Sequence, residues 1–345
     1  MTRAELKRQI EILLAAGDQR IRNGFIASVA EIVNDATLSL IARALDRGDI
    51  EAAIDAVGVE RAAFRALEDA IGSTYSAGGV HAAKTLPSLR DSSGARVVVR
   101  FDARNERAEE WLRDHSSSLV TSVMDDQRAA IRSALTDGMM AGQNPRTTAL
   151  DVVGRISGNS RSGGIVGLTS QQERTVAWVR RALQEGDADA LRRYMTLTRR
   201  DKRFDRSIAK VIDGTKKLTP DDVVKITGRL SDSYLQLRGE MIGRTESLAS
   251  LNASRSEAFR QAAEKAGTDA RFITREWSSA GDRRVRHSHA AMDGQKVQGL
   301  DTPFVSPNGY RMMHPGDSSL GAPGSETINC RCTTIMRVDY FEGRA

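Results

Sequence analysis

The stretch TPDDVVKITGRLSDSYLQLRGEMIGRTESLASLNASRSEAFRQAAEKAG, residues 219–267, carries a long helical pattern. It opens with a helix start, because Thr219 can cap the first turn, Pro220 suits the first helical position, and acidic residues follow at the positive end of the helix. The next apolar residues recur at steps of three and four: Val223, Ile226, Leu230, Tyr234, Leu237 and Met241. The pattern predicts one long helix, or a pair of helices that bends near Gly239 or Gly243.

Helical periodicity also dominates the chain before this stretch. Apolar residues repeat at helical steps from Met1 to about Glu68, over Asn105–Gly142 and over about Thr147–Ile156. Thr169-Ser-Gln-Gln172 matches a capping box that opens a further helix.

Two upstream segments interrupt the helical pattern. The glycine- and serine-rich segment Gly72–Gly94 indicates an irregular connection with a single helical turn. The β-branched run Ala95–Phe101 indicates a short strand or an extended arm.

The residues after Gly267 have a different character. ARFITREWSS, Ala270–Ser279, is predicted to be a strand, and four of the seven prolines lie beyond Leu300. The sequence therefore predicts a mainly α protein with a long helical N-terminal body and a small α+β C-terminal module. The predicted regions are an N-terminal helical region at 1–90, a helical body at 95–240 and the module at 241–340.

Composition and charge limit the class of protein. The chain has no run of about 18 apolar residues, so no membrane span is expected. Two cysteines cannot form a disulfide scaffold, which favours synthesis in a reducing cytoplasm. The net charge of +6 and the pI of about 9.5 allow contact with nucleic acid, although charged residues also simply solvate helices.

The basic excess is concentrated in one segment, RRDKRFDRSIAKVIDGTKK, residues 199–217, with eight basic and three acidic residues. Such a segment can lie against the phosphates of double-stranded DNA. The candidate nucleic-acid contacts are its basic residues: Arg199, Arg200, Lys202, Arg203, Arg206, Lys210, Lys216 and Lys217.

Most of the reactive side chains lie in the C-terminal module. Three of the five histidines and both cysteines fall there. Imidazole and thiolate are zinc ligands, and residues two apart on a strand face the same side, so His287 with His289 and Cys330 with Cys332 can each offer a pair. These four residues are the predicted metal ligands. A strained Cys330–Cys332 disulfide and a packed, hydrogen-bonded core without metal are the alternatives.

Two further interpretations concern charged and catalytic groups. Arg244 on the long helix can clamp Asp282 or Asp293 of the loops through a bidentate pair. A metal-dependent nuclease or hydrolase site is the main catalytic alternative, and its residues would be His289, His314, Asp317 and Asn329. Cys330 with His289 is a possible thiol nucleophile and base. No nucleophile elbow, phosphate loop or recognised nuclease spacing accompanies either set.

Three strings in this region occur in a recognisable order. RTESLASLNASR, WSSAGDRRVRHSHAAMDGQKV and HPGDSSLGAPGSETINCRC resemble the phage Mu F-like head morphogenesis family, also called minor head or minor capsid proteins. The resemblance spans Arg244–Cys332, about a quarter of the chain. It implies a non-enzymatic virion or procapsid protein in the head interior or at the portal vertex, made in the host cytoplasm. The implied partners are the portal protein, a major capsid or scaffold protein, and double-stranded DNA during packaging or ejection.

The resemblance also bears on zinc. Some members carry Cys-x-x-Cys before Asp-Gly and a histidine three residues before the first cysteine of Cys-Arg-Cys, and this set looks like a zinc site. Here Arg286 and His289 match the first pair, and Thr327 stands in place of the histidine. Zinc therefore stays an open expectation. The expected structural core of the module is Arg244, Glu246, Trp277, Asp282, Arg286, Asp293 and Asn329.

Overall fold

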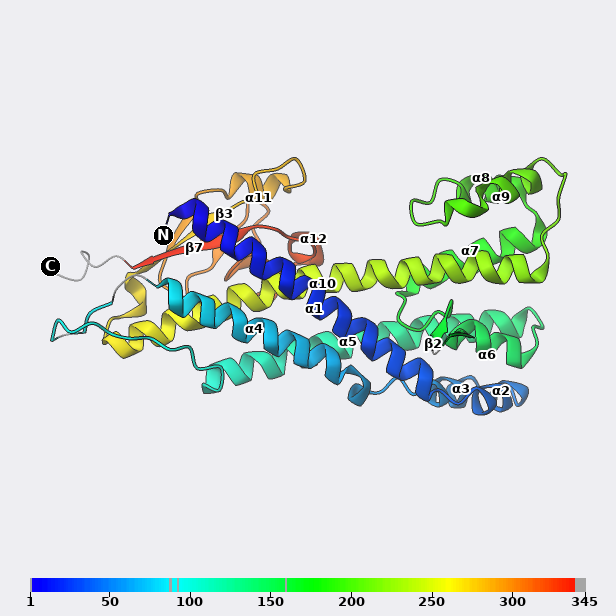
Figure 1. Ribbon diagram of the computed structural model, residues 1–345, viewed down its shortest axis with the longest axis horizontal. Helices are drawn as coiled ribbons and strands as arrows, with labels where there is room; N and C mark the ends of the chain where they lie inside the picture. Colours follow the sequence, from blue (N-terminus) through cyan, green and yellow to red (C-terminus); the bar gives the residue numbers. More distant parts are fainter. Residues whose placement is uncertain (1, 87–88, 92, 159, 339–345) are drawn as a thin grey trace. The chain divides into compact units, whose positions relative to one another are not determined.

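The computed structural model describes residues 2–86, 89–91, 93–158 and 160–338, and most of them lie in α-helices (Figure 1). The mainly α prediction with a small α+β C-terminal module is confirmed. Residues 339–340 of the predicted module and residues 1 and 87–88 of the predicted N-terminal region lie outside the described residues.

The chain forms two compact units that are each built from separate segments. Unit 1 contains the described residues of 1–23, 67–116 and 240–345, and unit 2 contains those of 24–66 and 117–239. One boundary between the units falls between Gly239 and Glu240, and the segment 90–95 lies inside unit 1. Three long helices contribute to both units: α1 (Arg3–Asp35), α5 (Glu106–Met140) and α10 (Pro220–Ala266).

Unit 2 is helical apart from one short antiparallel hairpin. Its capping box at Thr169 and Gln172 is confirmed, because each residue's side chain accepts a hydrogen bond from the other's backbone N–H, at 3.2 and 2.9 Å. Its shorter elements are α2 (Leu38–Asp46), α3 (Ile50–Val57), η1 (Arg61–Phe64), α6 (Pro145–Val153), β1 (Arg155–Ser157), β2 (Ser160–Ser162), α7 (Ser170–Glu185), α8 (Ala188–Tyr194), η2 (Lys202–Phe204) and α9 (Asp205–Ile212).

Among the described residues, no single helix is both long and apolar enough to cross a membrane. Helices α1 and α2 satisfy the same length and composition criteria only as a bent pair.

The long pattern that starts at Thr219 forms the single helix α10. Thr219 and Asp222 cap its start reciprocally, with both hydrogen bonds at 3.2 Å. The helix continues through Gly243, which lies against α1 so closely that a side chain there would overlap Asp18. This glycine therefore allows close helix packing in unit 1.

The predicted irregular connection at Gly72–Gly94 is wrong over its first half. Helix α4 (Arg65–Thr85) continues through this segment and packs on α10. A Cβ added at Gly78 would lie 2.9 Å from Leu251 Cδ1, and one added at Gly79 would overlap the ring of Phe101. These glycines break no helix because tertiary contacts that need a small residue outweigh their low helix propensity.

The run Ala95–Phe101 is an extended arm. Its only β contact within the described residues is an isolated bridge between Arg90 and Arg96. Val97 and Val99 pack against a cluster that includes Ala262 of α10, so the apolar β-branched residues cover a helix.

The C-terminal part of unit 1 forms the predicted α+β module. Its main sheet is antiparallel with the order β4–β3–β7, and β3 pairs with β7 along its whole length, from Ile273↔Val338 to Ser278↔Thr333 (Figure 1). A second pair, β5 with β6, stands apart in its own small sheet. The elements are η3 (Ala270–Phe272), β3 (Ile273–Ser278), α11 (His287–Ala291), β4 (Lys296–Gln298), β5 (Phe304–Val305), β6 (Arg311–Met312), α12 (Gly324–Thr327) and β7 (Thr333–Val338).

The core of the module surrounds Trp277, which is fully buried and meets Phe304 edge-on at 5.4 Å between ring centres. The other members of this cluster are Leu248, Met292, Met312, Ala322, Cys330 and Cys332. Both cysteines therefore lie in the apolar interior, next to the strand that the sequence predicted.

Two glycines of α4 provide a matched test of this packing. Gly79→Ala should lower the free energy of unfolding by about 1–3 kcal/mol, because the added methyl group overlaps the Phe101 ring. Gly72→Ala should raise it by about 0.5–1 kcal/mol, because nothing lies within 4 Å of the added carbon and alanine favours the helix. Urea unfolding followed by circular dichroism measures both changes. Equal effects of the two substitutions would contradict the packing described for Gly79.

Candidate metal centre

Three predicted ligands meet inside the C-terminal module. His289 on α11 is buried, and Cys330 and Cys332 lie in the segment between α12 and β7. His289 Nδ1 is 3.4 Å from Cys330 Sγ and 3.6 Å from Cys332 Sγ. The three potential ligand atoms lie within 4.8 Å of one another.

Local contacts fix the segment that carries the thiols. Asn329 has φ 56°, the left-handed conformation that asparagine tolerates better than most residues. Its backbone N–H donates to Thr245 Oγ1 of α10 at 3.2 Å, and the Arg286 guanidinium donates to the carbonyl of Ile328. The turn before Cys330 is therefore held from both α10 and the start of α11.

Glu326 on α12 orients the imidazole. Its Oε2 lies 2.8 Å from His289 Nε2, and its carboxylate also accepts from Asn308 Nδ2 at 2.8 Å and from Ser288 Oγ at 3.2 Å. Burial acts to raise the pKa of Glu326, but these hydrogen bonds and the nearby His289 outweigh it and hold the pKa below its ordinary value. An ionised Glu326 accepts a hydrogen bond from Nε2–H of His289, and in this tautomer Nδ1 presents its lone pair to the thiols.

The pKa values of the two thiols are shifted in opposite directions. A hydrogen bond from Cys330 and a contact with His289 lower the pKa of Cys332 to about 5 against the opposing effect of burial. The hydrogen bond to Cys332 and burial raise the pKa of Cys330. Cys332 is therefore the readier thiolate, and thiolate is the form that binds metal.

These donors fit a zinc ion. One imidazole nitrogen and two sulfurs are ligands that zinc prefers, and a carboxylate behind the histidine is the usual outer support of such a site. In this arrangement His289, Cys330 and Cys332 would hold the ion. A bound zinc ion would neutralise the thiolates and link α11 to the segment before β7.

The expectation that His287 and His289 share one face of a strand is wrong. These residues form α11, and residues two apart on a helix point in nearly opposite directions, roughly 200° apart. His289 consequently faces the core while His287 is exposed to solvent.

The predicted clamp from Arg244 to Asp282 or Asp293 is also wrong. Arg244 is half-exposed and lies 3.7 Å from Asp18 and 3.9 Å from Glu240. Arg331, which stands between the cysteines, pairs with Asp282 instead, and its hydrogen bonds help to lower the pKa of Asp282 to about 2. The pairing of Arg331 could not be predicted from the sequence, because Asp282 lies 49 residues earlier in the chain.

The other predicted core residues have separate partners. Trp277 packs edge-on against His289 at 5.1 Å, and Asp293 accepts a 2.7 Å hydrogen bond from the Ser279 N–H. Glu246 is buried and lies 2.5 Å from Nε2 of His115 on α5. No local pattern indicates His115, because it lies 131 residues before Glu246 in the chain.

Among the residues of the nuclease alternative, His314 and Asp317 lie near each other but outside the donor group of His289. His314 is buried with Nδ1 3.2 Å from the carbonyl of Pro315, and burial lowers its pKa. Asp317 accepts from the backbone N–H groups of Met313 and Ser319 at 2.7 and 2.9 Å. Neither residue joins His289 in its donor group, and their hydrogen bonds to backbone indicate a structural role.

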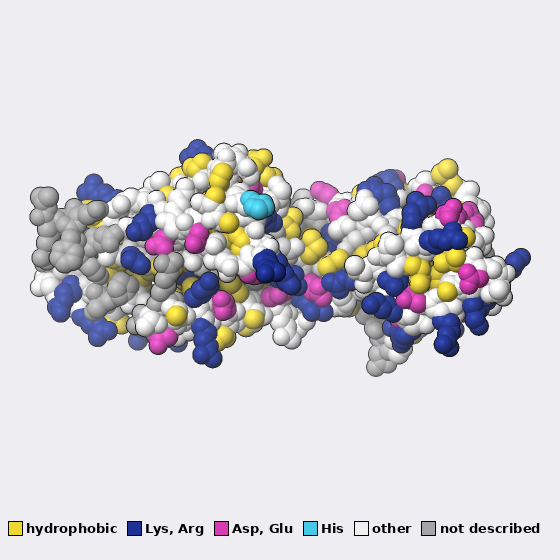
Figure 2. Space-filling model, turned by 90° about the horizontal axis from the view of Figure 1, so that it is seen from above, with side chains coloured by type: hydrophobic (Ala, Val, Ile, Leu, Met, Phe, Trp, Pro, Cys, Tyr) yellow, Lys and Arg dark blue, Asp and Glu magenta, His cyan; other side chains and the backbone are white. Residues whose placement is uncertain are grey.

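The predicted basic segment is divided between ion pairs and solvent. Arg200 pairs with Asp205 through two 3.0 Å hydrogen bonds, and Arg203 pairs with Asp201. Arg199 also has a partner, and Lys216 lies 3.5 Å from Ser207. The exposed remainder is Lys202, Arg206, Lys210 and Lys217. On the face shown in Figure 2, acidic side chains stand among the basic ones, without one continuous basic patch.

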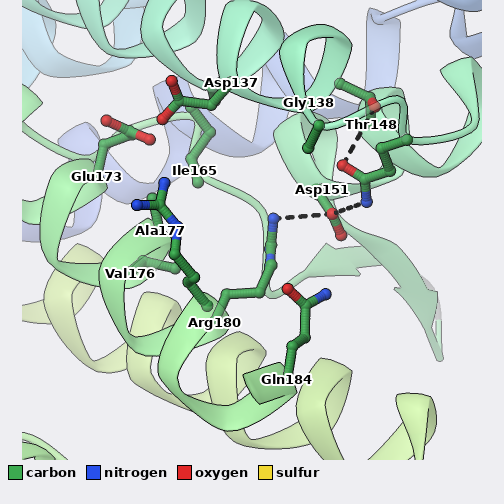
Figure 3. A pocket seen from close by; sticks show the side chains of 14 residues that line it. Asp137, Gly138, Thr148, Asp151, Ile165, Glu173, Val176, Ala177, Arg180 and Gln184 are labelled. Atoms are coloured by element: carbon green, nitrogen blue, oxygen red, sulfur yellow. Dashed lines mark hydrogen bonds and ion pairs between the residues drawn. The ribbon is translucent and has the colours of Figure 1, made fainter. Parts of the chain in front are cut away.

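Unit 2 contains a separate polar pocket of about 310 Å³ between α5, α6 and α7 (Figure 3). On one wall, Asp151 pairs with Arg180 at 2.8 Å and accepts from Gln143 at 2.9 Å. On the opposite wall stand Asp137 and Glu173. Burial raises the pKa of Glu173, whose Oε2 has no hydrogen-bond partner within the described residues. None of the described residues predicted to bind metal or nucleic acid lines this pocket.

Metal content tests the centre. The purified protein should bind about one zinc ion per chain, and His289→Ala or Cys332→Ser should abolish binding because each removes a ligand. Glu326→Gln should weaken binding by about 10–100-fold, because the imidazole loses its carboxylate support. His287→Ala is the matched control and should bind like the wild type. Elemental analysis and competition with a chromophoric chelator measure these effects. Full zinc content in the His289→Ala protein, or none in the wild type, would contradict the assignment.

Comparison with known proteins agrees with the motif order. The family model described as Phage Mu protein F like protein matches residues 129–335, more than half of the chain. The match contains much of the helical body and all three residues of the metal centre. No curated protein and no solved structure matches the chain. The chain therefore belongs to the phage Mu protein F-like family of phage head morphogenesis proteins.

Proposed function

We propose that this protein is a minor head protein of a tailed phage or prophage, located in the head interior or at the portal vertex. There it contributes to procapsid assembly and to DNA packaging or ejection. The observation that carries this proposal is the family match over residues 129–335, which includes the whole metal centre. The portal protein is the proposed main partner, with a major capsid or scaffold protein as a further one.

The proposed role is non-enzymatic. In support of this, His314 and Asp317 make hydrogen bonds with backbone groups inside the module and are not part of the donor group of His289. The buried centre lies in an apolar cluster, which suits a part that holds the fold. DNA cleavage by the purified protein that chelators abolish would favour the nuclease alternative instead.

The zinc centre has a defined place in this proposal. Its ligands come from α11 and from the segment before β7, so an ion would join the irregular loops to the sheet of the module. Head assembly would then depend on the correctly folded module, and His289 would be needed although it contacts no partner.

Particle assembly tests the proposed function. Deleting the gene from its phage or prophage should strongly lower the yield of infectious, DNA-filled particles. Wild-type protein and the His287→Ala variant should restore the yield, whereas His289→Ala should not. Plaque titre, electron microscopy of heads and cross-linking to the portal protein measure the outcome. Normal assembly, packaging and infection without the protein would overturn the proposal.

DNA contact is a separate part of the proposal and rests on the four exposed basic residues of the segment at 199–217. Binding to duplex DNA should weaken with rising salt, and replacing Lys202, Arg206, Lys210 and Lys217 by alanine should reduce the log–log salt slope by up to about 4. The matched control replaces four exposed arginines elsewhere: Arg8, Arg65, Arg104 and Arg146. Fluorescence anisotropy measures the slope. An equal loss in both variants would indicate only a general effect of net charge.

A further inference from the structure

The residues that the structure describes supply three donors where a zinc ion usually takes four ligands. Within the described residues, only His289, Cys330 and Cys332 form a group of potential ligands. His287 is exposed on the other side of α11, and Glu326 is engaged with His289 Nε2. The position of the family's additional histidine holds Thr327, whose hydroxyl donates to the Pro323 carbonyl at 3.3 Å.

A pocket of about 380 Å³ in unit 1 adjoins this centre at Cys330. Its walls come from α1, from α10 and from the loops of the module. The lining residues near the centre are Ser279, Ala280, Asp282, Arg331 and Thr333. Across from them, α1 contributes Leu14 and Ala15. Away from the pocket, the apolar side chains of Trp277 and Met292 pack in the same cluster as the two thiols.

The charges of the pocket are largely balanced. Asp282 is paired with Arg331, and Asp18 lies 3.7 Å from Arg244. Lys7 and Glu11 complete the charged lining. A small monoanion or a neutral molecule fits such a pocket better than a polyanion does, because no excess of positive charge is available.

We propose that the metal ion held by His289, Cys330 and Cys332 keeps a fourth coordination position that none of the described residues fills and that opens to the pocket beside Cys330. The ligand class is a small, exchangeable donor such as a monoanion. The inference rests on the metal centre proposed above. It distinguishes this chain from a closed four-ligand structural site, in which all positions belong to the protein.

Cobalt substitution with a thiocyanate titration tests the open position. Co²⁺ replaces zinc, and its visible bands report changes of ligand, while the thiolate-to-metal bands show whether both sulfurs stay bound. Thiocyanate should change the visible bands of the full chain saturably without removing the thiolate bands. Perchlorate at the same ionic strength, which coordinates poorly, should leave them unchanged.

A matched pair on α1 locates the opening. Ala15 lines the pocket and its exposed neighbour Ala16 does not. Ala15→Phe should weaken thiocyanate binding by about tenfold or more, roughly 1.4 kcal/mol, because the ring fills the pocket. Ala16→Phe should bind thiocyanate like the wild type. Elemental analysis should give the same cobalt content in all three proteins.

Three results would overturn the inference. Bound cobalt with bands that thiocyanate does not change would show a closed site, and would leave the metal centre and the head function intact. Equal thiocyanate binding by the Ala15→Phe and Ala16→Phe proteins would show that the position does not open to this pocket. Absence of bound cobalt would remove the open position together with the metal centre.

Discussion

The guanidinium of Arg275 is the contact on which the C-terminal module depends. It is fully buried in β3 and donates to the carbonyls of Gly299, Thr302 and Met313, at 2.8 Å for Gly299 and 2.5 Å for Met313. The segment from 299 to 313 has little regular structure, so its carbonyls need partners from elsewhere. Hydrogen bonds to a charged donor contribute about 1.5–3 kcal/mol each, and one side chain provides three of them. The segment from 299 to 313 thus takes its shape in part from a strand residue.

Two other buried arginines also donate hydrogen bonds to backbone carbonyls. Arg238 of α10 donates to the carbonyls of Gly167 and Leu168 at 3.1 and 2.6 Å, which closes the loop before α7 in unit 2. Arg255, also on α10, donates to the Thr334 carbonyl of β7 at 2.9 Å. Burial lowers the pKa of each of these two arginines to about 10, which still leaves them charged near neutral pH. Some of the chain's basic residues therefore bind backbone groups in its interior.

Regular patterns could be predicted from the sequence because their causes are local. The caps at Thr219 and Thr169 and the strand β3 at Ile273–Ser278 follow from neighbouring residues, as does the grouping of Cys330 with Cys332, whereas the first residues of the predicted strand form η3 at Ala270–Phe272. The placement of Gly78 and Gly79 inside α4 could not be predicted, because its cause is the close approach of α10 and Phe101. The prediction that His287 faces the same side as His289 was wrong, because residues two apart face the same side of a strand but nearly opposite sides of a helix.

The residues that support the candidate site could not be predicted from the sequence for a related reason. Glu326 acquires its role only when α12 brings it to His289, and Arg331 only when the segment after Ile328 turns toward Asp282. Arg275 and Arg238 look like surface residues in a list of amino acids, since arginine is seldom buried without a partner. The partners of Arg275 are backbone carbonyls, and Arg238 contacts two carbonyls and Asp126, which lies far from it in the sequence; neither set of partners is visible as a local sequence pattern.

Unit 1 is built from segments that lie far apart in the sequence, and this affects how the protein folds during synthesis. Asp18 of α1 packs against Gly243, and Asp102 exchanges two 2.9 Å hydrogen bonds with Gln261, a residue 159 positions later. During synthesis, the first segments of unit 1 leave the ribosome long before the half of α10 that covers them. Their apolar faces therefore stay exposed until α10 has been made. Chaperones can bind such an apolar face during synthesis. The segment that carries the family's motifs would therefore lose packing partners if it were cut from the chain, because α1 and α4 pack on its helix α10.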